Sequence, residues 1–238
     1  MSTRTLRKGI AASVLSAGAL VGLSGGAAFA SPTHHSFSVA QQQKLEAQLA
    51  VRVTGLAHLA ADVSGATSLT PAHAALLSAR IATEQANINA LVIKVPTDTT
   101  NAQLNSDRAA MYQDNRVFAV MTPQVFETIN ADSAAAQLAT LQKNEATLAT
   151  EVSSLTGQPG YQNAVNHLNN YMTRIGREST TLSNLVISVL AQQPSGYPGN
   201  QHFFVRANHE ILQADVAIAY ANYDASVIAL ATGGYTGS

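Results

Sequence analysis

The chain of 238 residues contains no cysteine and no tryptophan, and only 11% of its residues are charged. The lack of cysteine excludes disulfide bonds, thiolate metal sites and a lipid-modified cysteine at an export signal. The lack of tryptophan, with aromatic residues at only 5%, disfavours a cleft that stacks carbohydrate rings. Because an ordinary soluble domain has about 25% charged residues, the exposed faces here must consist largely of Gln, Asn, Ser, Thr and Ala.

Motifs of enzymes and metal proteins are also missing. Beyond residue 30 there is no Gly-x-Ser-x-Gly sequence, no glycine-rich phosphate loop and no Glu-x-x-His pair. His202 and His209 are separated by two helical turns, about 10 Å, which is too far for one metal ion. His58, His73 and His167 are isolated in the sequence and are expected on helix surfaces. We therefore predict no catalytic residue, no metal, no cofactor and no enzymatic activity.

The N-terminus has the pattern of a secretory signal. Arg4, Arg7 and Lys8 precede an apolar run that ends in Ala28-Phe29-Ala30. This pattern predicts a signal peptide over residues 1–30, cleaved between Ala30 and Ser31, and a secreted protein. The alternative is an N-terminal membrane anchor, which the glycines in the run disfavour.

The mature chain would have ten basic and fourteen acidic residues, a net charge of −4. This balance argues against a nucleic-acid partner, which requires a basic face. No later segment is apolar enough to span a membrane. Residues 31–37, which include the paired His34 and His35, are expected to form a mobile leader, and residues 232–238 a mobile tail.

Apolar residues recur at alternating steps of four and three, the spacing of helices that pack on one another. Helices are expected over 38–63, 71–95, 161–189 and from Asn200 onward, with a helix-to-helix turn at Gly157–Gly160. The positions expected to pack, here called seams, are Leu45, Leu49, Arg52, Leu56, Leu59 and Val63, then Leu77, Ile81, Glu84, Ile88, Leu91 and Val95 in the first two helices. Those of the last two are Tyr161, Val165, Leu168, Met172, Ile175, Ser179, Leu182, Val186 and Val189, then Phe204, Ala207, Ile211, Ala214, Ile218, Ala221, Ala225 and Ile228.

Between these pairs, residues 100–155 contain one proline and no glycine and read as a long central helix. Pro123 lacks an amide hydrogen and should kink or divide it. The predicted fold is all-α: an elongated antiparallel bundle of two three-helix units, 38–122 and 123–231, that share the central helix kinked near Pro123. The alternative is a single up-down bundle of four or five helices.

Two of the seam positions carry opposite charges. If the first two helices form an antiparallel hairpin, Arg52 lies opposite Glu84, and the next helix brings Arg108 and Tyr112 to the same level. We predict a structural polar layer of these four residues, with a partly buried Arg52–Glu84 ion pair that fixes the register. A ligand-binding role for this layer is the less favoured reading.

Residues 69–150 resemble a loosely defined group of uncharacterised secreted helical proteins of actinobacteria. The similar positions are Ile88-Asn89-Ala90-Leu91, Asp98-Thr99, Leu104, Asp107, Arg116-Val117-Phe118 and Pro123, and the chain departs from the pattern at Asn115, where an aromatic is expected. The resemblance implies export and a helical fold but no activity. Arg116 is a weak candidate for binding a carboxylate or phosphate, and the alternative is an ion pair on the helix surface or between helices.

These observations favour a secreted, non-enzymatic scaffold or interaction protein of the cell envelope. Its partner is unknown, an envelope component or a second copy of the chain. The alternative function is a carrier that holds an apolar small ligand between helices that separate at Pro123.

Overall fold

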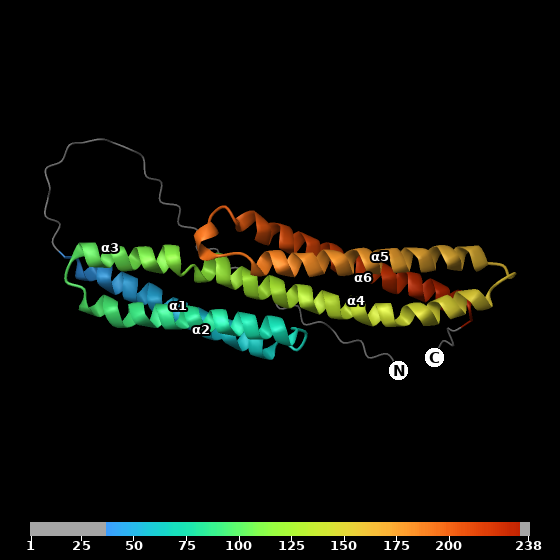
Figure 1. Cartoon of the computed structure of the whole chain (residues 1–238), viewed down its shortest axis with the longest axis horizontal. Helices are drawn as coiled ribbons and strands as arrows, with labels where there is room; N and C mark the ends of the chain where they lie inside the picture. The colour runs from blue at the N-terminus through green and yellow to red at the C-terminus, as the bar shows by residue number, and fades with distance from the viewer. Residues whose placement is uncertain (1–36, 234–238) are drawn as a thin grey trace, which may run out of the picture. The chain divides into compact units, whose positions relative to one another are not determined.

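The computed structural model describes residues 37–233, which form an all-α helical bundle (Figure 1). Its helices are α1 (Val39–Gly65), α2 (Pro71–Lys94), α3 (Asn101–Ala109), α4 (Thr122–Ser154), α5 (Tyr161–Leu190) and α6 (Gln201–Ala231). Short turns connect them: 3-10 turns η1 (Val95–Thr97) and η4 (Pro194–Gly196), and π-helical turns η2 (Ala110–Asp114) and η3 (Val117–Met121). The predicted signal peptide with its cleavage site at Ala30 and Ser31, nearly all of the predicted leader, and the end of the predicted tail lie outside the described residues.

Local sequence signals explain where several helices begin. The Ser38 hydroxyl accepts the Gln41 N–H at the start of α1, and Thr70 does the same for α2, directly before a proline in the first turn. Gly157 and Gly160 adopt positive φ angles in the turn between α4 and α5, a conformation that glycine tolerates at little cost. The predicted helix-to-helix turn at this position is therefore confirmed.

The first two helices pack as the spacing predicts. All of the predicted seam residues of α1 and α2 are buried, including Leu49 and Ile88, which have no exposed surface. These two helices pair with one another, and α3 and η3 contact α1 (Figure 1). The hairpin is held by apolar burial worth about 1.5–3 kcal/mol for each fully buried leucine or isoleucine.

The remaining long helices, α4, α5 and α6, each pack against the other two. The α6 seam is buried as predicted, with Ala225 half-buried. In α5 the predicted seam is one residue out of position over part of its length: Met172 is 38% exposed, whereas Tyr171 is fully buried. The physical reason is that the Tyr171 hydroxyl donates a 2.6 Å hydrogen bond to the Leu141 carbonyl, which satisfies its polar group inside the bundle.

The predicted central helix is divided, and the division precedes Pro123. Asn115 and Arg116 have non-helical dihedral angles, and the two π-helical turns η2 and η3 lie on either side of them. Pro123 lies in the first turn of α4, where its missing N–H costs least. The apolar spacing changes phase at this break, so Phe118, which follows the buried Leu104 and Met111 at steps of seven, is instead 49% exposed.

Candidate functional site: a polar pocket at the helix break

A pocket of about 260 Å³ lies beside the break in the central helix. It is lined by the Arg80–Glu84 turn of α2, by Arg116 and by the segment Gln192–Pro194. The lining also includes two apolar residues of η3, Val120 and Met121, here called the floor. Two lining residues belong to the π-helical turn η3, and such turns recur at functional sites.

Glu84 is the buried charge of this pocket. It is 9% exposed, and its Oε2 atom has no hydrogen-bond partner. Burial raises the pKa of this carboxyl above its ordinary value. The predicted ion pair with Arg52 is absent: among residues 37–233, no side-chain oxygen of Glu84 lies within 4.0 Å of a basic nitrogen.

Arg52 instead packs against aromatic rings. Its guanidinium carbon lies 4.9 Å from the centre of the Tyr112 ring and 5.4 Å from that of Phe118, and Nη1 donates to the Gln48 carbonyl at 3.0 Å. These contacts stabilise the buried guanidinium of Arg52, which has no carboxylate partner. Burial lowers the pKa of Arg52, and Tyr112 partly offsets that effect.

The predicted polar layer is thus only partly assembled. The structure brings Arg52 and Tyr112 together and places Glu84 on the facing helix. Arg108 points elsewhere, because its Nη1 donates to Asn105 within α3 at 3.3 Å. At the level of Glu84 the structure therefore has a pocket in place of the predicted layer of four paired polar residues.

Arg116, the weak ligand candidate, does line the pocket. Its guanidinium carbon lies 4.3 Å from the centre of the Tyr197 ring, and its Nε donates to the Gln113 carbonyl at 3.2 Å. Neither Arg116 nor Arg80 belongs to an ion pair found in the described part of the chain. Burial lowers the pKa of Arg80, as expected for a partly desolvated cation without a counter-charge.

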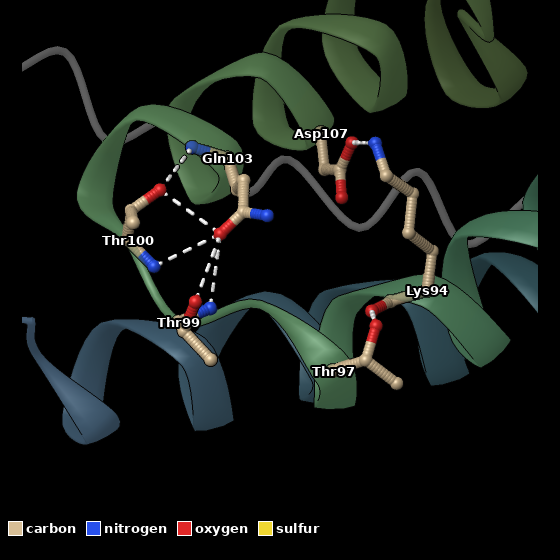
Figure 2. Close-up of polar contacts among 6 residues, drawn as sticks. All are labelled: Lys94, Thr97, Thr99, Thr100, Gln103 and Asp107. Atoms are coloured by element: carbon tan, nitrogen blue, oxygen red, sulfur yellow. Dashed lines mark hydrogen bonds and ion pairs between the residues drawn. The ribbon is translucent and has the colours of Figure 1, made fainter.

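The turn between α2 and α3 holds a separate polar cluster (Figure 2). Thr100 and Gln103 form a capping box, and the Gln103 Oε1 also accepts the Thr99 N–H at 3.0 Å. The Lys94 ammonium forms an ion pair with the buried Asp107, which raises the pKa of the lysine. These contacts close the turn, so we assign them a structural role.

Two histidines predicted to lie on helix surfaces are paired with buried aspartates. His73 Nδ1 lies 2.8 Å from Oδ2 of Asp132, which also accepts the Thr70 N–H at 2.9 Å. His167 Nδ1 lies 2.7 Å from Oδ1 of Asp224. Each pair joins helices about 60 residues apart in the chain, so no local sequence signal could have revealed it.

The outward face of α6 carries a second stripe of apolar spacing. Its members, here called the outer seam, alternate by four and three and are all exposed: Val205, His209, Leu212, Val216, Ala219, Tyr223, Ser226 and Leu230. At 100° per residue they lie on the side of α6 opposite its buried seam. The sequence analysis did not predict this stripe, which has six apolar members against eight in the buried seam of the same helix.

Over the residues described, no three histidine or acidic side chains are grouped so that they could hold a metal ion. In the same part of the chain, no helix has both the length and the hydropathy needed to cross a membrane. Comparison with known proteins gave no match to a family model, to a curated protein or to a solved structure. The resemblance to secreted actinobacterial proteins therefore stays a prediction.

Proposed function

We propose that the protein is an exported helical interaction protein of the cell envelope that self-associates through the outer seam of α6. The observation that carries this proposal is the outer seam itself. Val205, Leu212, Tyr223 and Leu230 are each more than half exposed, although they have the spacing of residues that pack against another helix. Exposed apolar residues scattered singly need no explanation, whereas a continuous stripe does.

A second copy of α6 in antiparallel orientation fits this stripe. In one register Val205 lies opposite Leu230, and Leu212 lies opposite Tyr223. The same register places small Ala219 opposite Val216, and it brings the two polar seam members, His209 and Ser226, together. Shifting the register by one heptad in either direction would separate His209 from Ser226 and place one of them opposite an apolar seam residue, Ala219 or Val216, which costs desolvation without a partner.

The charges beside the outer seam do not oppose this pairing. Only Arg206 and Asp215 are charged among the flanking positions, and in this register they lie opposite Val227 and Asn222. The seam extends along about 38 Å of helix. With a width of about 10 Å, the paired strip has a footprint on the order of 400 Å² per copy, comparable with patches that are functional on other proteins.

The experiment is light scattering of the purified full chain over a wide range of protein concentration. The wild-type chain is expected to form a dimer, and Leu212→Glu is expected to weaken dimerisation at least tenfold because it buries a charge at the interface. Ile187→Glu is the matched control, because this residue is 66% exposed on α5 outside the stripe. A monomer at every concentration, or equal dimerisation of the two variants, would contradict the proposal.

The export part of the proposal has its own test. The secreted protein should begin at Ser31, which mass spectrometry of the intact chain from the culture medium measures directly. Retention of residues 1–30 on a cell-associated protein would favour the N-terminal anchor instead. Neither result affects the light-scattering test of self-association through α6.

A further inference from the structure

We propose that the pocket at the helix break binds a compact organic monocarboxylate, whose carboxylate is held by Arg80 and Arg116 and whose apolar part rests on Val120 and Met121. The self-association of α6 is not needed for this inference. The pocket lies on other elements, α2, η3 and the segment before α6. The sequence indicated only Arg116 as a ligand-binding residue, whereas the proposed site contains two arginines and the apolar floor.

The first argument is the charge of the lining. Arg80 and Arg116 line the pocket together, and in the described part of the chain neither has an ion-pair partner. By contrast, Arg174, Arg177 and Arg206 all have acidic partners within 3.5 Å. A guanidinium presents a planar fork of donors that matches a carboxylate, so two of them without an ionic partner beside one pocket predict an anion there.

The second argument is Glu84, which limits the charge of the ligand. Glu84 is nine-tenths buried and its Oε2 is unpartnered at the pocket wall. Two arginines and one carboxyl give a lining with at most two positive charges, and only one when Glu84 is ionised. Since a dianion would repel an ionised Glu84, a monocarboxylate fits the lining better than a phosphate.

The third argument is size and floor. A volume of about 260 Å³ suits a small organic molecule, because pockets for drug-sized ligands range from about 300 to 1,000 Å³. Val120 is 1% exposed and Met121 6% exposed, so these two apolar side chains add only a small surface to the lining and no competing donors. A short apolar body with a terminal carboxylate matches both the floor and the two arginines.

Benzoate is a suitable probe because it has nine non-hydrogen atoms and one carboxylate, and benzamide is its neutral counterpart of equal size. We would follow the amide resonances of Thr83, Val120 and Gln193 by NMR while each compound is added to the full chain. Benzoate is expected to cause saturable shifts with a roughly millimolar Kd, the range for so small a ligand. Benzamide and inorganic phosphate are expected to bind at least tenfold more weakly.

The variants Arg80→Gln and Arg116→Gln should each weaken benzoate binding about tenfold, and Arg80→Lys, which keeps the charge but not the planar fork, should fall between. Arg108→Gln is the control, because Arg108 lies outside the pocket and bonds within α3. Unchanged α5 and α6 resonances show that each variant is folded. Equal benzoate affinity in all variants, equal binding of benzoate and benzamide, or no saturable shift at the pocket overturns the proposal. Phosphate binding that is tighter than benzoate binding also overturns it, because the site would then be a phosphate site.

Discussion

The two helical hairpins differ in what they leave unsatisfied. In the hairpin of α1 and α2, the buried charges Arg52 and Glu84 have no ionic partner among the described residues, while the apolar seam is completely buried. In the pair of α5 and α6, the buried carboxylates Glu178 and Asp224 have basic partners, while an entire apolar stripe faces outward. In our proposals, α2 of the first hairpin helps to bind a small ligand through Arg80, and α6 of the second binds another helix through its apolar stripe.

The contrast should be largest when a buried charge with ionic partners is removed. Asp224→Ala leaves His167 and Arg174 without their common partner between α5 and α6. We expect the free energy of unfolding to fall by about 3 kcal/mol, since breaking a buried pair from one side leaves the other side uncompensated. Urea denaturation measures this change. Asp62→Ala, at an exposed position of α1, should change stability by less than about 0.5 kcal/mol.

The same substitution in the two hairpins should have opposite effects. Glu178→Gln should destabilise the protein by about 1–2 kcal/mol, because Arg177 contacts this carboxylate at 2.6 Å. Glu84→Gln should stabilise it by about 1 kcal/mol at neutral pH, because the buried carboxylate has an unpartnered oxygen. Opposite signs in parallel denaturation experiments support the comparison. Equal losses in the two variants would show that Glu84 has a stabilising partner in solution.

The pH dependence of the Glu84 effect follows from its pKa. Burial raises the pKa in the folded state, so the wild-type protein loses stability as pH rises from the unfolded-state pKa through the folded-state pKa. The advantage of Glu84→Gln should therefore vanish at a pH where the carboxyl is neutral in both states. An advantage that persisted there would point to packing rather than charge.

Glu127 of α4 provides a smaller effect of the same kind. Burial raises the pKa of this half-buried carboxyl to about 7, and its Oε2 has no partner. Stability should decline as pH rises from about 4.5 to about 7, by about 1 kcal/mol once partial exposure to water is taken into account. Glu127→Gln should flatten this part of the stability curve in thermal denaturation at several pH values. A variant curve with the same slope as that of the wild-type chain would assign the slope to another group.

The sequence predicted well those parts of the fold that depend on local spacing. The seams of α1, α2 and α6 are buried at the predicted positions, because one helix face in contact with a neighbour imposes a period that is visible in a single chain. The prediction that Met172 is buried in the seam was wrong. Helix α5 contacts both α4 and α6, so two adjacent stripes of the helix can be buried, and the hydrogen bond of the Tyr171 hydroxyl favours the stripe that contains Tyr171.

The site was less predictable for a physical reason. The pocket depends on the break at Asn115–Arg116, where the backbone leaves the helix although neither a glycine nor a proline stands at the break. Arg52 and Glu84 were correctly placed on facing seams, but the aromatic rings of Tyr112 and Phe118 stack on the guanidinium. Such a choice between an ion pair and a cation–π contact depends on side-chain geometry that spacing does not encode.

The most direct test of the account is the distance between spin labels on the outer seam. Because the chain has no cysteine, Val205→Cys and Ala219→Cys each provide a single labelling site. Antiparallel pairing of α6 predicts a separation of about 38 Å along the helix between the two copies for Val205, but only about 5 Å for Ala219. Pulsed electron paramagnetic resonance should therefore find a long distance for the first variant and a short one for the second. Short distances for both, or no dipolar coupling in either, would contradict self-association through this face.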